Sequence, residues 1–266
     1  MKTIFKKYPV ISRIILALIL FGGSLFFTGL IQIDLVKKYF PFVSVTLLTV
    51  STWFLYKTEN KTLKTIGLNI SFRNIGFLFL GLAIGVVALG LQKYFTSFYT
   101  DEKWTVNPSV IIEKLALSLY IILPTVAVEE FLFRGYLFKK TIEVSSVVKA
   151  NIIFSVLFML IHTLDANVLQ NPVKLIFLAV SIPVGHLLFA TALLKSKTLF
   201  FPIGLHWGNN WAAQNLIGND TNNNTLMHAT NTNSNSWAQF IIILILFNVF
   251  FLLLTFIIWK WGSWKS

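Results

Sequence analysis

The apolar stretch IILALILFGGSLFFTGLI, from Ile14 to Ile31, contains no charged residue. A helix of about 18 such residues is long enough to cross the hydrocarbon core of a bilayer. Lysines precede the stretch, as in a signal peptide, but no small-residue cleavage site follows it cleanly, so we interpret it as a first membrane helix. Comparable stretches recur along the whole chain. The sequence therefore predicts an all-α protein, a polytopic bundle of membrane helices.

The composition supports a lipid environment. Of the 266 residues, 56% are hydrophobic and only 12% are charged, and the mean hydropathy is +0.74. Soluble domains carry about twice that share of charge. The absence of cysteine excludes disulfides, thiolate nucleophiles and Cys-ligated zinc. The net charge of +12 comes from lysines that flank apolar segments, which favours a membrane partner and no nucleic acid.

The apolar segments predict about eight transmembrane helices. They lie near residues 10–31, 39–56, 73–94, 109–134, 147–164, 173–194, 199–217 and 237–259. No repeat or soluble domain interrupts them, so we expect residues 1–266 to form a single membrane domain. Residues 218–236 are rich in Asn and Thr and predict an exposed loop, in which His228 is solvated.

The distribution of basic residues predicts the orientation in the membrane. If the N-terminus is cytoplasmic, eight spans return the C-terminus to the same side. Most of the 22 lysines and arginines then lie in cytoplasmic segments. This bias is typical of an N-in, C-in topology, and it places the Asn-rich loop outside.

Two adjacent glutamates, Glu129 and Glu130, lie within an apolar segment. Burying a carboxylate in a membrane is costly, and two neighbours also repel each other. Arg134 follows Glu130 by four residues, so the two share a helix face and can pair. Glu129 points about 100° away. We therefore predict Glu130 as the ion-pair partner and Glu129 as the free carboxylate; the competing interpretation is a charge cluster at the helix end.

Three histidines also lie in apolar segments. His206 and Asn210 are four residues apart and project from one face of a helix. His162 ends another apolar segment. An imidazole can bind a metal or move protons, and an amide can donate to an oxyanion. A lone histidine in a membrane helix often makes only an interhelical hydrogen bond, and we assign that role to His186.

Depth along the helices offers a test of whether these residues form one site. At 1.5 Å per residue, and with the helix of Glu129 extended to about Lys139, Glu129 lies about 15 Å from its cytoplasmic end. The same calculation places His162 about 22 Å deep, and His206 and Asn210 about 12 and 18 Å deep. All four fall in the middle of a hydrocarbon core of about 30 Å. We expect a single site.

Such a set of side chains suits hydrolysis by an activated water. Glu129 is the candidate general base, and His162 is expected to orient the water or to bind a metal. His206 and Asn210 are expected to donate to the developing oxyanion, while Glu130 and Arg134 position Glu129.

Zinc is an open alternative for this site. Glu129, His162 and His206 together would make a three-ligand catalytic set with one open position. The chain has no His-Glu-x-x-His helix, so the spacing does not require a metal.

The order of these motifs resembles the CAAX protease and bacteriocin-processing family of intramembrane proteases. The resemblance covers roughly residues 110–215 and rests on three motifs in separate segments: Glu129-Glu130-x-x-x-Arg134, Phe158-x-x-x-His162 and His206-x-x-x-Asn210. It implies an α-helical intramembrane peptidase in which Glu129 is catalytic, with His162, His206 and Asn210 around the water. Bacterial members are linked to peptide maturation or to self-immunity against bacteriocins. The Lys-, Asn- and Ile-rich composition is typical of a low-GC bacterium, so we expect a bacterial cytoplasmic membrane protein and not CAAX processing itself.

Two other functions compete with a protease. A non-catalytic immunity or scaffold protein would use the same polar residues to bind a partner. A proton-coupled transporter would use them as a relay, although the chain lacks repeated halves with matched broken helices. We favour the protease, with a peptide or membrane protein as its substrate; the sequence leaves the oligomeric state open.

Overall fold

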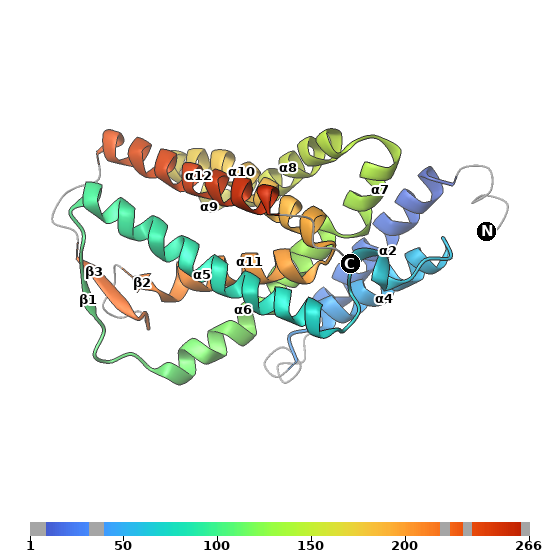
Figure 1. Cartoon of the computed structure of the whole chain (residues 1–266), viewed down its shortest axis with the longest axis horizontal. Helices are drawn as coiled ribbons and strands as arrows, with labels where there is room; N and C mark the ends of the chain where they lie inside the picture. The colour runs from blue at the N-terminus through green and yellow to red at the C-terminus, as the bar shows by residue number, and fades with distance from the viewer. Residues whose placement is uncertain (1–8, 32–39, 219–223, 231–235, 262–266) are drawn as a thin grey trace.

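The computed structural model describes residues 9–31, 40–218, 224–230 and 236–261. Over these residues the chain is a bundle of helices with one small sheet, which confirms the predicted all-α class (Figure 1). Eight long helices lie in these residues. In the order of the chain they are α2 (Ile11–Leu30), α4 (Val43–Lys57), α5 (Phe72–Thr100), α6 (Ile112–Arg134), α8 (Val147–Thr163), α10 (Pro172–Ser196), α11 (Phe200–Asn215) and α12 (Trp237–Lys260). The short elements between them are η1 (Leu63–Ile66), α7 (Tyr136–Val144) and α9 (Ala166–Leu169).

Each of the eight predicted spans overlaps one of these long helices. However, only five helical segments among the described residues are long and apolar enough to cross a membrane: α2, α5, α6 with α7, α10 and α12. The helices α4, α8 and α11 have 15, 17 and 16 residues. At 1.5 Å per residue, a helix of 16 residues spans about 24 Å, less than the hydrocarbon core.

Helix α11 is short because it is enclosed by protein rather than lipid. Its residues 201–208 are all buried, and it packs against α5, α6 and α10. Two of its glycines meet the backbone of α5: a Cβ on Gly204 would lie 2.1 Å from the carbonyl oxygen of Leu78, and one on Gly208 would lie 2.1 Å from that of Leu82. Small residues of this kind let two membrane helices approach closely. The contact fixes the position of α11 at the centre of the bundle.

Helix α6 ends at Arg134, where the predicted span 109–134 ends, and not near Lys139, to which the depth calculation extended it. The chain turns at Gly135, where ψ is −141°, and α7 begins at Tyr136. A Cβ on Gly135 would lie 2.0 Å from the carbonyl oxygen of Phe131, so only glycine fits this break. The break leaves Glu129 and Glu130 in the last two turns of α6, next to the turn rather than in mid-helix.

Part of the Asn-rich segment is a strand rather than the predicted loop. β3 (Met227–Thr230) pairs antiparallel with β1 (Lys103–Val106) and parallel with β2 (Ile217–Gly218). The strand is held because Ala229 is buried and because the side chain of Asn107 donates to the carbonyl of Thr225. His228 is half-buried in this strand. Residues 219–223 and 231–235 of the predicted loop lie outside the described residues.

The sheet lies at one end of the bundle. In Figure 1 the start of α2 and the end of α12 both lie toward the opposite end. The segments that join α4 to α5, α7 to α8 and α10 to α11 lie at that end too.

Candidate active site

The site begins with a buried ion pair near the end of α6. The Nη1 atom of Arg134 donates to Oε1 of Glu130 at 3.0 Å, and both side chains are 0% exposed. This is the i, i+4 pair that the sequence predicted. Because an unpaired buried charge is expensive, each of the two residues depends on the other.

His206 links this ion pair to Glu129. Its Nδ1 lies 2.8 Å from Oε1 of Glu130, and its Nε2 lies 3.5 Å from Oε2 of Glu129. The second contact is longer and is not a hydrogen bond, and Glu129 accepts no hydrogen bond from the described residues. Glu130 also has one oxygen without a partner, Oε2, but its Oε1 accepts two hydrogen bonds and its side chain is 0% exposed. The side chain of Glu129 is 20% exposed, so Glu129 is the more accessible carboxylate of the two.

The hydrogen bond to Glu130 assigns the protons on His206. A carboxylate only accepts, so Nδ1 carries the proton that is shared with Glu130. The contact fixes the plane of the imidazole ring and directs Nε2 toward Glu129. Such an arrangement, with one nitrogen held by a carboxylate and the other facing the site, is typical of histidines that transfer protons.

Two phenylalanines enclose the charged groups. The guanidinium carbon of Arg134 lies 4.2 Å from the ring centre of Phe158 and 5.2 Å from that of Phe189. Phe189 also stacks on His206, with ring centres 4.6 Å apart and an angle of 17°. Cation–π contacts are strongest where water is excluded, so these rings partly compensate Arg134 for the hydration that it loses.

The sequence did not assign these roles to Phe158 and Phe189. One feature of the sequence pointed to Phe158: it precedes His162 by four residues and so shares its helix face. No feature of the sequence pointed to Phe189, since α10 is apolar along most of its length.

A cavity of about 320 Å³ lies beside His206. His162, His206 and Asn210 all line it, so three of the four predicted catalytic residues face one space. Glu129 is not a lining residue, and it reaches the cavity through its contact with His206. Most of the remaining wall is apolar and comes from α8, α10 and α12, including the rings of Phe177, Phe247 and Phe251.

His162 and Asn210 have atoms free to act in this cavity. Nδ1 of His162 lies 2.8 Å from the carbonyl oxygen of Phe158, to which it donates, so Nε2 is the nitrogen left for other contacts. The Asn210 carbonyl accepts a long contact of 3.5 Å from the amide of Asn209. Its own amide nitrogen donates no hydrogen bond within the part of the chain that the structure describes.

The predicted zinc ligands do not come together as a set. Over the described residues, no group of three or more His, Cys, Asp or Glu side chains is placed to hold a metal ion. Glu129 and His206 are neighbours, but His162 is tied to its own helix through Phe158. These three donors, as they are arranged, do not fit a metal centre.

His186 does not make the interhelical hydrogen bond that we predicted for it. Its side chain is 0% exposed, and neither ring nitrogen has a hydrogen-bond partner among the described residues. The ring instead lies edge-on to Phe138, with centres 5.7 Å apart. The prediction was wrong, because the ring packs against the aromatic rings of Phe138 and Phe158 and forms no hydrogen bond with a described residue.

The fold and the site together define a polytopic α-helical membrane protein with a buried Glu-Glu-Arg-His cluster beside a cavity. Residues 111–212 match a protein-family model, described as type II CAAX prenyl endopeptidase Rce1-like. The match covers all three motifs and confirms the resemblance to the CAAX protease and bacteriocin-processing family over that segment. No curated protein and no solved structure matches the chain.

Proposed function

We propose that this protein is an intramembrane endopeptidase that hydrolyses a peptide bond with a water activated by Glu129. The family match supports a CAAX-type intramembrane protease. The observation that carries the finer proposal is that Glu129, 20% exposed, accepts no hydrogen bond from the described residues, while its Oε2 lies 3.5 Å from Nε2 of His206, a residue that lines the cavity. A carboxylate held without a partner in a buried site is available to accept a proton.

In this mechanism Glu129 takes a proton from a water molecule while the water oxygen attacks the peptide carbonyl carbon. The tetrahedral intermediate then collapses, the carbon–nitrogen bond breaks, and Glu129 returns the proton to the leaving amine. His162 lines the same cavity and has Nε2 free, which suits it to orient the water. General acid–base catalysis of this kind typically contributes about 10²–10⁴-fold in rate.

His206 and Asn210 are the proposed donors to the oxyanion. Asn210 has an amide nitrogen that makes no other hydrogen bond within the described residues, and His206 lines the same cavity, with its Nε2 3.5 Å from Oε2 of Glu129. His206 acts as a donor when Nε2 is protonated. Glu130 and Arg134 hold the ring in place through Nδ1, so the donor is oriented before the substrate arrives. Preorganised donors in a water-excluded site are worth several kcal/mol.

The proposed substrate is a peptide or a segment of a membrane protein. The apolar, phenylalanine-rich wall of the cavity favours apolar side chains next to the scissile bond. We place the protein in a bacterial cytoplasmic membrane with both termini in the cytoplasm. Its role there is peptide processing or self-immunity against bacteriocins.

A comparison of peptide termini tests the proposal without a prior choice of substrate. The wild type, Glu129→Gln and a control, Glu113→Gln, would be expressed in the same host, and membrane and secreted peptides would be compared by mass spectrometry. Glu113 lies in the first turn of the same helix and is exposed. We expect new termini with the wild type and the control only.

If Glu129→Gln keeps the cellular phenotype and no termini differ, the hydrolase is wrong and a non-catalytic immunity or scaffold protein takes its place. Zinc is a separate proposal, because His162 would have to move toward Glu129 and His206 to complete a ligand set. Metal analysis of the purified wild type and of His162→Ala would test it, and equal metal content in the two proteins would contradict it.

A further inference from the structure

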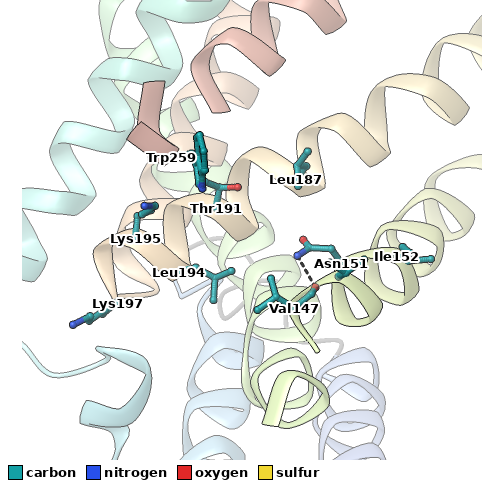
Figure 2. A pocket seen from close by; sticks show the side chains of 10 residues that line it. Val147, Asn151, Ile152, Leu187, Thr191, Leu194, Lys195, Lys197 and Trp259 are labelled. Carbon is teal, nitrogen blue, oxygen red and sulfur yellow. Dashed lines mark hydrogen bonds between the residues drawn. The ribbon is translucent and has the colours of Figure 1, made fainter. Parts of the chain in front are cut away.

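A second and larger cavity lies on the outside of the bundle, away from the candidate active site. It has a volume of about 640 Å³ and shares no lining residue with the active-site cavity. Figure 2 shows the residues that line it on three ribbons, α8, α10 and α12. Helix α10 packs against both of the others, so the cavity is a groove with α10 as its floor.

The groove has an apolar part and a basic part. Leu187, Ile152 and Leu194 supply aliphatic surface, while Lys195 and Lys197 lie where α10 ends. Leu187 precedes Lys195 by eight residues, which is about 12 Å along a helix. The charged end and the apolar end of the groove therefore lie at different depths along α10.

An exposed tryptophan lies between lysines at the basic end. Trp259 is 52% exposed. Nζ of Lys195 lies 5.8 Å from its ring centre, and Nζ of Lys260 lies 4.8 Å from it. In Figure 2 Lys195 extends beside Trp259. Tryptophan and lysine are both typical of the membrane–water interface, so this end of the groove lies at headgroup level.

The positive charge at this end is not neutralised by the protein. Within the described residues no carboxylate forms an ion pair with Lys195, Lys197 or Lys260, whereas the lysines at positions 61 and 140 are paired with glutamates. A ligand that brings its own negative charge would be attracted here. Basic pockets between membrane helices on the cytoplasmic side are suited to the headgroups of anionic lipids.

A polar atom in the wall of the groove affects which headgroup the groove favours. Asn151 donates its amide to the carbonyl of Val147 at 2.9 Å, which leaves Oδ1 without a hydrogen bond among the described residues. Oδ1 can only accept, so it favours a headgroup that offers hydroxyl donors.

We propose that this groove is a binding site for an anionic phospholipid, with a glycerol-type headgroup favoured over choline. The phosphate lies against Lys195 and Lys197 beside Trp259, and an acyl chain follows Leu187 and Ile152. A choline headgroup carries a cation of its own and would bring it close to the lysines. The site does not depend on the protease proposal.

Native mass spectrometry of the purified full chain tests this site. The protein would be titrated with phosphatidylglycerol and with phosphatidylcholine of the same acyl chains. We expect phosphatidylglycerol to bind more tightly to the wild type. Each lysine near an anionic headgroup is worth about a fivefold change in affinity. The double variant Lys195→Gln/Lys197→Gln should therefore lose most of that preference.

Two controls make the result specific. Lys174 lies on the same helix at its other end, outside the groove. The variant Lys174→Gln should therefore keep the wild-type preference for phosphatidylglycerol. Thr191→Trp fills the groove and should weaken the binding of both lipids. Equal binding of the two lipids to the wild type, or an unchanged preference in the double variant, would overturn the proposal. Displacement of phosphatidylglycerol by millimolar inorganic phosphate would also overturn it, because the site would then recognise a free anion.

Discussion

At the scale of single residues, Glu129 and Glu130 have the same side chain and opposite environments. Glu130 is 0% exposed and accepts from both Arg134 and His206. Glu129 is partly exposed and accepts no hydrogen bond within the described part of the chain. Their difference follows from the helix pitch, which turns one of two neighbours toward Arg134 and the other away.

This difference predicts that one conservative variant loses stability and that the other loses cleavage. Glu130→Gln removes the charge that pairs with buried Arg134 and should destabilise the protein by about 3–5 kcal/mol. Glu129→Gln removes only a free carboxylate, so it should abolish peptide cleavage with little change in unfolding temperature. Thermal unfolding in detergent and the analysis of peptide termini measure the two effects. A large loss of stability in Glu129→Gln would show that its carboxylate is structural.

The sequence predicted part of this site. The rest could not be predicted, because it depends on contacts between residues that are far apart in the chain. The pairing of Glu130 with Arg134 is local, so the i, i+4 spacing was sufficient to predict it. The contact between Glu130 and His206 joins residues 76 positions apart and depends on how α6 packs on α11. The stacking of Phe189 on His206 is also tertiary, and an apolar residue in an apolar helix carries no signal of it.

At the scale of helices, the positions of the spans were predictable because hydropathy is a local property. The break at Gly135 was not, since the apolar pattern continues through it. The strand at Met227–Thr230 was also missed, because its antiparallel partner β1 lies far away in the chain. The Asn- and Thr-rich composition of the segment around it is typical of loops.

The contact between α5 and α11 gives a prediction at this scale. Gly208→Ala places a Cβ about 2 Å from the Leu82 carbonyl oxygen, so the helices must separate. Overpacking of this kind typically costs about 1–3 kcal/mol. We expect a lower unfolding temperature together with reduced cleavage, since α11 carries His206. Gly76→Ala is the matched control on α5, because a Cβ there meets nothing within 4 Å. Equal effects of the two variants would contradict this account.

At the scale of the whole molecule, a polar network joins the first helices to the segment that matched the family. Glu59 follows α4, and Nζ of Lys140 on α7 donates to its Oε2 at 2.7 Å. Tyr136 on α7 also donates to Glu59, and Lys61 lies 3.2 Å from it. Arg13 of α2 lies 3.9 Å from the same carboxylate. Through Glu59, helices α2 and α4 are connected to α7, which follows the helix that carries Glu129.

The titration of Glu59 gives a prediction for the stability of this connection. Burial alone would raise the pKa of Glu59, but hydrogen bonds from Lys140, Tyr136 and Lys61 outweigh it and lower the pKa below its ordinary value of 4.5. A carboxyl group with a lowered pKa in the folded state stabilises the protein fully above pH 4.5. That contribution is lost as the pH falls through the folded-state pKa.

The unfolding temperature of the wild type should therefore exceed that of Glu59→Gln at pH 7. The gap should narrow as the pH falls below 4.5, because protonated Glu59 then resembles the amide. Asp165→Asn, whose carboxylate only caps the short helix α9, is the control and leaves the network intact. A gap between the wild type and Glu59→Gln that stays constant from pH 7 to pH 3 would mean that the charge of Glu59 does not stabilise the fold. The connection between the first helices and α7 would then rest on packing, as in the edge-to-face contact of Tyr56 with Tyr136 at 5.1 Å.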